Sequence, residues 1–140
     1  NNLLRGFIEE LSKNYPYLVM DNEAGLEHLS RRTTQNVDVF LVTSDASVRG
    51  VRSAGRIKEL AESLNLGIKK MYLVVTKTVN GTLPALKEEI ERTGLELAGE
   101  VPMDEEVYRY DLEGRPLVSL PENSPAVKAV RDIMYKAGIL

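Results

Sequence analysis

The sequence predicts an α/β fold, a three-layer sandwich in which a mainly parallel sheet lies between helices. Short apolar runs alternate along the chain with longer segments of helical spacing. Continuous apolar runs of this length are typical of strands buried on both faces, and strands that alternate with helices favour right-handed parallel crossovers. The 140 residues fit one compact domain, and no linker-like stretch divides residues 1–140.

Four apolar runs are predicted to be strands. They are Tyr17–Met20, Val37–Val42, Met71–Val75 and Leu95–Val101, the last of which is interrupted by Gly99. Each contains β-branched or aromatic residues and is bounded by polar residues or turn formers, as is usual for buried strands.

Helices are predicted between and around these runs. Leu3 to Leu11 repeat at helical spacing before the first run, and a short acidic helix is expected to begin at Asp104. The other starts are Ser47, Thr82 and Ser124 as caps, and the corresponding stops are Gly67, Gly94 and Gly138. Residues 111–123, which contain one glycine and two prolines, are predicted to form a surface loop.

Composition excludes several classes of function. The net charge is −3, which gives no basic footprint for nucleic acid and no polybasic membrane patch. No apolar run approaches the roughly 18 residues that cross a bilayer, so the expected location is the cytoplasm. With no Cys and a single His, His28, the chain offers neither disulfides nor a zinc site of its own.

Polar residues follow each predicted strand, at the edge where open α/β sheets bind ligands. The sets are Asp21–Gly25, Thr43–Asp45, Thr76–Thr78 and Pro102–Asp104. We expect all four to share one rim of the sheet.

Asp21 is the most informative of these residues because it directly follows an apolar run. In this Walker B arrangement, the carboxylate holds the water shell of Mg²⁺ and helps to place an attacking water. Gly25 would let the backbone turn close to a terminal phosphate. An aspartate after a strand also commonly caps a turn, so the pattern leaves both interpretations open.

The remaining candidates also have two interpretations. Lys77 can stack its aliphatic stem on an adenine ring or extend into solvent. Asp104 can contact a ligand or cap a helix. Neither a Gly-x-x-x-x-Gly-Lys-Ser/Thr loop nor a Gly-x-Gly-x-x-Gly stretch is present, so this chain alone cannot hold a triphosphate in the P-loop manner.

The stretch from Tyr17 to Arg31, YLVMDNEAGLEHLSR, resembles the Walker B and switch region of the CooC-type ATPases that insert nickel into carbon monoxide dehydrogenase. These are deviant P-loop ATPases of the MinD/ParA-like superfamily. Septum-site relatives tend to carry Asp-x-Pro-Ala-Gly, and Glu23 stands in place of that proline. Residues 45–57 and the Pro102–Asp104 loop are also similar to this superfamily, so the resemblance covers most of the chain.

The resemblance implies roles for individual residues. Asp21 would serve Mg²⁺ and water activation, and residues 24–31 would form the nucleotide-sensing switch. The adenine would be surrounded by Thr76, Lys77, Pro102, Met103 and Asp104. The family usually has Asn-Lys or Asn-Arg where this chain has Thr76-Lys77, and Thr76 lacks the amide that pairs with the base in both directions.

The resemblance also implies that residues 1–140 are a single incomplete nucleotide-binding domain, the C-terminal portion of a longer protein. The N-terminal half would carry the Walker A loop and a Cys-x-Cys motif that binds nickel or another metal. The whole protein would bind ATP, ADP and Mg²⁺, form a homodimer and act on carbon monoxide dehydrogenase. This portion alone would be inactive and would expose an apolar sheet edge.

Two other functions remain open. One is a spatial-organisation ATPase of the MinD/ParA kind, although the chain's last turn carries only one cation, Lys136, unlike a basic membrane-binding helix. The other is a non-catalytic α/β interaction module.

Overall fold

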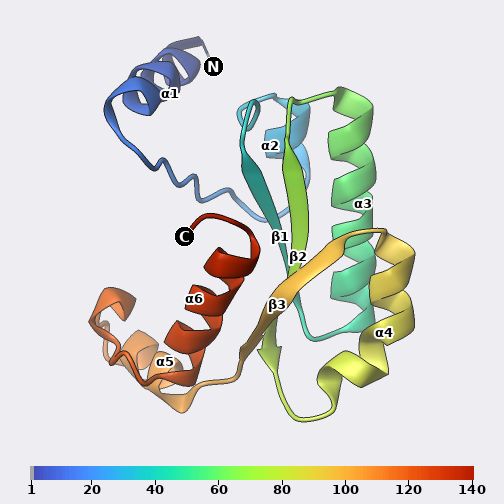
Figure 1. Ribbon diagram of the computed structural model, residues 1–140, viewed down its shortest axis with the longest axis vertical. Helices are drawn as coiled ribbons and strands as arrows, with labels where there is room; N and C mark the ends of the chain where they lie inside the picture. Colours follow the sequence, from blue (N-terminus) through green and yellow to red (C-terminus); the bar gives the residue numbers. More distant parts are fainter. Residues whose placement is uncertain (1) are drawn as a thin grey trace.

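A computed structural model describes residues 2–140 and has a three-stranded parallel sheet in the order β1-β2-β3 (Figure 1). The α/β class with a parallel sheet is therefore confirmed. The elements in chain order are α1 (Asn2–Asn14), α2 (Glu27–Ser30), β1 (Val39–Asp45), α3 (Val48–Leu64), β2 (Lys70–Thr78), α4 (Thr82–Thr93), β3 (Glu96–Pro102), α5 (Glu105–Leu112), the 3₁₀ turn η1 (Leu117–Ser119) and α6 (Pro125–Lys136).

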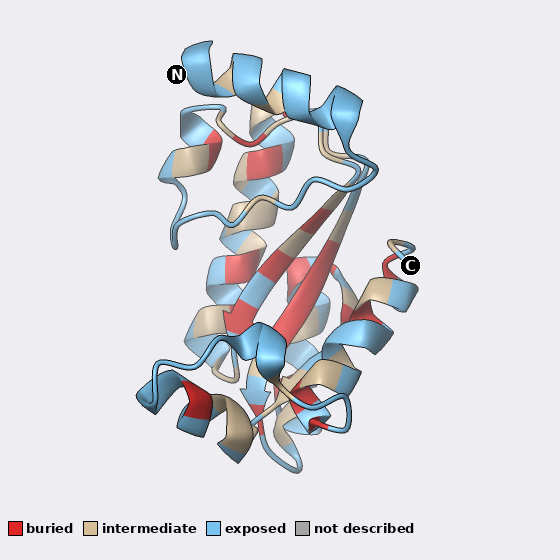
Figure 2. Cartoon of the chain, turned by 90° about the vertical axis from the view of Figure 1, so that its left-hand side faces the viewer, coloured by how far each residue is buried: buried red, intermediate tan, exposed pale blue. Residues whose placement is uncertain are grey.

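Helices cover both faces of the sheet because alternate strand residues point to opposite sides. On one face, Val42, Leu73 and Val75 pack against α3 and α4. On the other, Tyr72 and Val74 pack against Ile133 and Ala137 at the C-terminal end of the chain. The buried residues in Figure 2 accordingly lie along the strands and on the helix sides that face them. None of the helices within residues 2–140 has the length and apolar character that crossing a membrane requires.

Side-chain caps fix several helix starts as the sequence predicts. The hydroxyl of Ser47 accepts from the Gly50 amide at 3.0 Å, and that of Ser124 accepts from the Val127 amide at 3.3 Å. The prediction for α4 is wrong in detail, because its cap is Gly81, whose φ of 84° favours glycine. Thr82 is the first helical residue, and its hydroxyl instead bonds both backbone groups of Val79.

The predicted strand at Tyr17–Met20 is absent. This segment is extended without sheet pairing, and the side chain of Val19 is 85% exposed. In Figure 1 it crosses from the isolated helix α1 towards α2. A parallel strand needs hydrogen bonds from a neighbouring strand, and no such neighbour lies beside it in the described residues. The apolar run is therefore present but unpaired. The outer edge of β1 also has no partner strand within residues 2–140, so the free sheet edge lies at β1 and not beside the predicted strand at residues 17–20.

The loop predicted at residues 111–123 is more ordered than expected. Helix α5 extends to Leu112, and η1 occupies residues 117–119. Tyr110, the buried residue of α5, accounts for this order because the amide of Arg115 donates to its carbonyl at 2.8 Å and the guanidinium lies 3.9 Å above its ring.

Candidate functional site

The carboxyl ends of the three strands are linked into one polar edge. The hydroxyl of Thr76 donates to the carbonyl of Ser44 at 3.2 Å, which joins β2 to β1. The amide of Met103 donates to the carbonyl of Thr78 at 2.9 Å, which joins the segment after β3 to β2. Three of the four predicted polar sets therefore do lie on one rim, which is the lower end of the sheet in Figure 1.

Lys77 forms a β-bulge at this rim. Thr76 pairs with Val101 and Thr78 pairs with Pro102, so Lys77 is an extra residue between two paired ones. Its φ of 57° lies in the left-handed region, which is uncommon for residues other than glycine. Bulges re-aim a side chain at sheet edges and next to active sites. The sequence places Lys77 at the strand end but gives no signal for the bulge, because the register depends on β3.

Pro102 and Met103 present an apolar surface beside this bulge. The Met103 side chain is 64% exposed although Met is usually buried, and Pro102 is half-buried. Both line a hollow of about 410 Å³. Its other lining residues are Glu100 and Thr78 to Pro84. Exposed apolar side chains next to polar strand ends can pack against a planar ring such as a nucleobase.

The Asp104 carboxylate accepts hydrogen bonds at the starts of two helices, α5 and α6. One carboxylate oxygen accepts from the Glu106 amide at 2.9 Å and so caps α5. The other accepts from the Ser124 hydroxyl at 2.5 Å and the Ala126 amide at 3.2 Å, which ties in the start of α6. These hydrogen bonds, foremost that of Ser124, hold the pKa of Asp104 below its usual range despite partial desolvation. The helix-cap interpretation accounts for its contacts, and a ligand contact remains a prediction.

The start of α3 also reaches this rim. The Ser47 hydroxyl donates to the Asp45 carboxylate at 2.6 Å. Gly50 lies so close to Asp45 and Ser44 that a Cβ there would collide with both side chains. The carboxylate of Asp45 therefore occupies the space at this helix start.

Asp21 does not lie with the other candidates. Its neighbour Asn22 accepts a hydrogen bond at 2.7 Å from the hydroxyl of Thr34, a fully buried residue shortly before β1 begins. The amino and carboxyl ends of the seven-residue strand β1 are about 20 Å apart. The expectation that all four polar sets share one rim is thus wrong for residues 21–25, because without a paired strand at 17–20 nothing carries Asp21 to the carboxyl edge.

The Asp21–Thr34 segment nevertheless has a defined conformation. Leu29 on α2 is fully buried in the core cluster that includes Val51 of α3. Gly25 has a φ of 104° with open space around it, so the backbone angle, not close approach, favours glycine there. Partial burial lowers the pKa of His28, and the nearby Glu23 carboxylate offsets part of this shift.

Several of the predicted nucleotide and Mg²⁺ contacts are accessible at the surface. Lys77 and Met103 are exposed at the rim, and the Asp21 carboxylate is exposed with no hydrogen bond or ion pair within residues 2–140. The same residues contain no cluster of three His, Cys, Asp or Glu side chains that could bind a metal. Asp21 is thus separated from the rim residues, and a role of either in binding a nucleotide or Mg²⁺ remains a prediction.

No protein-family model matches the chain. It is 47% identical to an uncharacterized ATP-binding protein of Methanocaldococcus jannaschii, over 97% of this chain and 54% of that protein. It is 27% identical to the septum site-determining protein MinD of Bacillus subtilis, over 93% of this chain and 50% of that protein. It is also 27% identical to the carbon monoxide dehydrogenase accessory protein CooC of Rhodospirillum rubrum, over 84% and 43%. The chain spans about half the length of these relatives.

The structure resembles the MinD cell division protein of Aquifex aeolicus with a TM-score of 0.78 at 21% sequence identity. The match covers 98% of this chain and 60% of that one. The chain therefore has the fold of part of a MinD-like P-loop NTPase, and its sequence is similar both to an uncharacterized ATP-binding protein and to MinD.

Proposed function

We propose that this chain is the adenine-contacting and switch portion of a MinD/ParA-like ATPase about twice its length. The observation that carries the proposal is the rim at which the strained bulge residue Lys77 lies next to the half-buried Pro102 and the exposed Met103. Strained backbone and exposed apolar side chains are both costly to maintain, and they coincide at the sheet edge where parallel α/β folds bind ligands.

In this proposal the rim residues bind the base. Pro102 and Met103 contact one face of the adenine, and the Lys77 stem covers it from the bulge. Thr76 offers only a hydroxyl, which already donates to Ser44, so base pairing contributes little to recognition. Asp104 positions the Met103 backbone by anchoring both flanking helices. A phosphate-binding loop outside residues 1–140 holds the triphosphate with Mg²⁺.

The proposal gives Asp21 a role that requires a rearrangement. A further strand of the intact protein would pair with the free edge of β1, and residues 17–20 would then join the enlarged sheet as a strand. This pairing would move Asp21 towards the rim. Two observations support this step, namely the exposed apolar side chains of Tyr17 and Val19 and the lack of a partner on the outer edge of β1 within the described residues. Asp21 would then hold the water shell of Mg²⁺.

For the cellular role, we propose maturation of a metal enzyme, with nickel as cargo and carbon monoxide dehydrogenase as client. The support is the DNEAGLEHLSR stretch, in which Glu23 replaces the proline of septum-site proteins. We further propose that the intact protein is a homodimer with the cargo bound at an upstream Cys-x-Cys motif. Spatial organisation of the MinD kind is the second candidate, because the identities to MinD and CooC are equal at 27%.

The test uses the full-length protein that contains this chain. We expect micromolar ATP affinity by calorimetry and Mg²⁺-dependent hydrolysis, whereas the 140-residue chain alone should hydrolyse nothing. Asp21→Asn should lower the hydrolysis rate by about 100-fold or more with little change in ATP affinity, because the carboxylate acts mainly on the attacking water. Met103→Ala should instead weaken ATP binding by about tenfold, or roughly 1.4 kcal/mol.

Asp132→Asn, at an exposed position on α6, is the matched control and should retain full activity. Hydrolysis by Asp21→Asn at the rate of this control would refute the role of Asp21, and a full-length protein that does not bind ATP would refute the function itself. ATP-dependent activation of nickel-free carbon monoxide dehydrogenase by the full-length protein separates metal-centre maturation from spatial organisation.

A further inference from the structure

Helix α5 and η1 expose an unusual amount of apolar surface. Tyr108 and Leu112 on α5 are 67% and 71% exposed, and Leu117 and Val118 on η1 are 50% and 93% exposed. We call these four residues the α5–η1 surface. The two elements are in contact with each other and form the lower left corner of the molecule in Figure 1, away from the sheet. Large apolar side chains that gather on one exposed corner commonly mark an interaction site.

Hydrogen bonds on the buried side of α5 hold the α5–η1 surface in place. Asp104 caps α5 and fixes it to the start of α6. Tyr110, on the buried side of α5, lies under the Arg115 guanidinium, which donates to its hydroxyl at 3.0 Å. The same hydroxyl lies 3.4 Å from the Ser119 carbonyl, which ties η1 to α5. A preorganised surface loses little conformational entropy on binding.

The surrounding charge is strongly negative. Residues 104–122 contain six acidic and two basic side chains, a net charge of −4 within a chain whose total is −3. Both basic residues are already paired, Arg109 with Glu106 at 2.7 Å and Arg115 with Glu113 at 3.4 Å. Glu105, Asp111 and Glu122 are exposed and have no ion pair within residues 2–140. The negative charge of the whole chain is thus concentrated around this exposed apolar corner.

Helix geometry places acidic and apolar side chains on the same face of α5. Glu105, Tyr108 and Leu112 follow each other at spacings of three and four residues, so they share one face of α5. A partner must therefore supply apolar side chains for the centre and positive charges for the border. Nucleic acids and anionic membrane surfaces carry the same sign of charge as this border and are disfavoured.

We propose that the α5–η1 surface binds a basic amphipathic helix of a protein partner, with apolar residues on one side and Lys or Arg on its flanks. Such helices dock by placing apolar side chains at intervals of three or four residues against an exposed apolar surface. The α5–η1 surface lies outside the proposed nucleotide contacts, so we expect the helix to bind without ATP. This proposal can therefore be tested separately from the proposed ATPase function.

The test uses the full-length protein without nucleotide and a fluorescent 14-residue helical peptide of Leu and Lys. A second peptide with the same Leu positions and Glu in place of Lys is the matched probe. We expect the Lys peptide to bind in fluorescence anisotropy, with an affinity that falls as salt is added, and the Glu peptide to bind at least about tenfold more weakly. The double substitution Leu112→Ser with Val118→Ser should weaken the Lys peptide by about tenfold or more.

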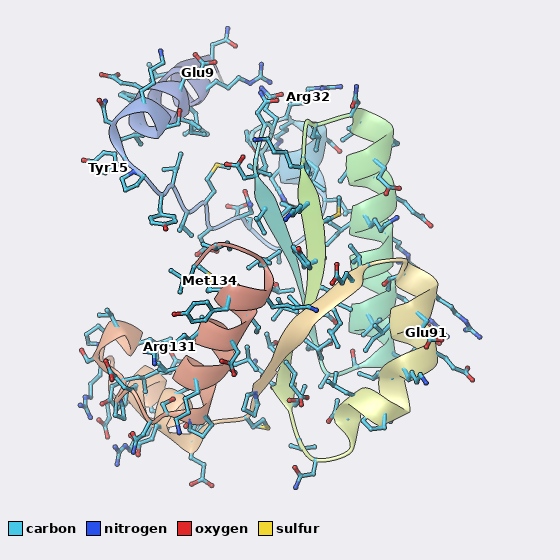
Figure 3. All side chains as sticks on the ribbon, viewed as in Figure 1. Glu9, Tyr15, Arg32, Glu91, Arg131 and Met134 are labelled. Carbon is cyan, nitrogen blue, oxygen red and sulfur yellow. The ribbon has the colours of Figure 1, made fainter. Side chains whose placement is uncertain are left out.

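Two further variants keep the result interpretable. Tyr135→Ser removes an aromatic residue of α6 that is about as exposed as Tyr108, and it should leave binding unchanged. The outer side of α6 is basic, and Arg131 on it points away from the sheet in Figure 3. Glu105→Gln with Asp111→Asn keeps the fold and the apolar residues, and should weaken the Lys peptide and flatten its salt dependence.

Several outcomes would overturn the proposal. These are equal binding of the two peptides, equal loss in Tyr135→Ser, or absence of Lys-peptide binding. Light scattering that shows self-association of the full-length protein, abolished by Leu112→Ser with Val118→Ser, would identify a second copy as the occupant and would equally refute the proposal.

Discussion

Replacing Lys77 by glycine is expected to stabilise the protein, although it removes a side chain from the candidate site. The φ of 57° places Lys77 in the left-handed region, where the Cβ of an L-residue lies too close to the backbone. Glycine has no Cβ and adopts this conformation freely. The bulge between Thr76 and Thr78 fixes the angle, so the strain cannot be relieved without breaking the pairing of β2 with β3.

The magnitude follows from two opposing terms. Left-handed backbone costs an L-residue about 1–2 kcal/mol, whereas glycine loses about 0.5–1 kcal/mol more conformational free energy than alanine on folding. Lys77→Gly should therefore exceed Lys77→Ala in free energy of unfolding by about 0.5–1 kcal/mol, the difference between these two estimates. For a domain of this size the corresponding rise in melting temperature is roughly 2–4 °C.

Lys87 provides the control, because it is exposed on α4 in ordinary helical conformation. There the glycine variant should be less stable than the alanine variant by about 1 kcal/mol. Urea unfolding followed by circular dichroism measures all four variants, and comparison of glycine with alanine cancels the loss of the Lys side chain. If Lys77→Gly is less stable than Lys77→Ala, the bulge and the strain argument built on it are wrong.

Two other predictions test the packing around the site. Asp104→Asn should cost about 1–2 kcal/mol at pH 7, because the side-chain amide can still accept from Glu106 but its NH2 group cannot accept from the Ser124 hydroxyl and the Ala126 amide. Since the pKa of Asp104 is lowered in the folded protein, the contribution of its carboxylate is present above the unfolded pKa and is lost as pH falls through the folded pKa. Unfolding measured from pH 7 to 2 should therefore show a smaller acid destabilisation in Asp104→Asn than in Asp111→Asn. Gly99→Ala would place a Cβ 2.8 Å from Cγ1 of Ile133 and should lower the free energy of unfolding by about 1–3 kcal/mol. Gly6→Ala, in open space on α1, is the control and should be neutral or stabilising. Equal melting temperatures for the two glycine variants would contradict the close packing of α6 on β3.

Local patterns predicted the elements whose partners lie within the chain. The runs at residues 37–42, 71–75 and 95–101 coincide largely with β1, β2 and β3, because each has at least one parallel neighbour to pair with. Ser47 and Ser124 are caps as predicted, and Asp104 has the cap role that was one of its two interpretations, because a capping hydrogen bond spans only two or three residues. Gly99, which interrupts the last run, is explained by the approach of α6 instead of by a broken strand.

The same reasoning failed at Tyr17–Met20. The composition of this run is that of a buried strand, and only the absence of a neighbour distinguishes it from β1. The position of Asp21 depends on that run, so the sequence could predict a carboxylate after an apolar segment but not where the carboxylate lies. The side chain that fixes its surroundings, Thr34, is twelve residues from its partner Asn22 and forms no recognisable motif.

The sequence by itself determined the α/β class, the order of strands and α-helices after residue 36, the caps of α3 and α6, and the polar residues at the carboxyl end of each strand. Those features depend on periodicity and on hydrogen bonds between near neighbours. Only the tertiary structure decided the left-handed bulge at Lys77, the double capping by Asp104, the exposed corner formed by α5 and η1, and the unpaired state of residues 17–20. Each depends on register or contact between segments far apart in the chain, and no local pattern encodes which segments will meet.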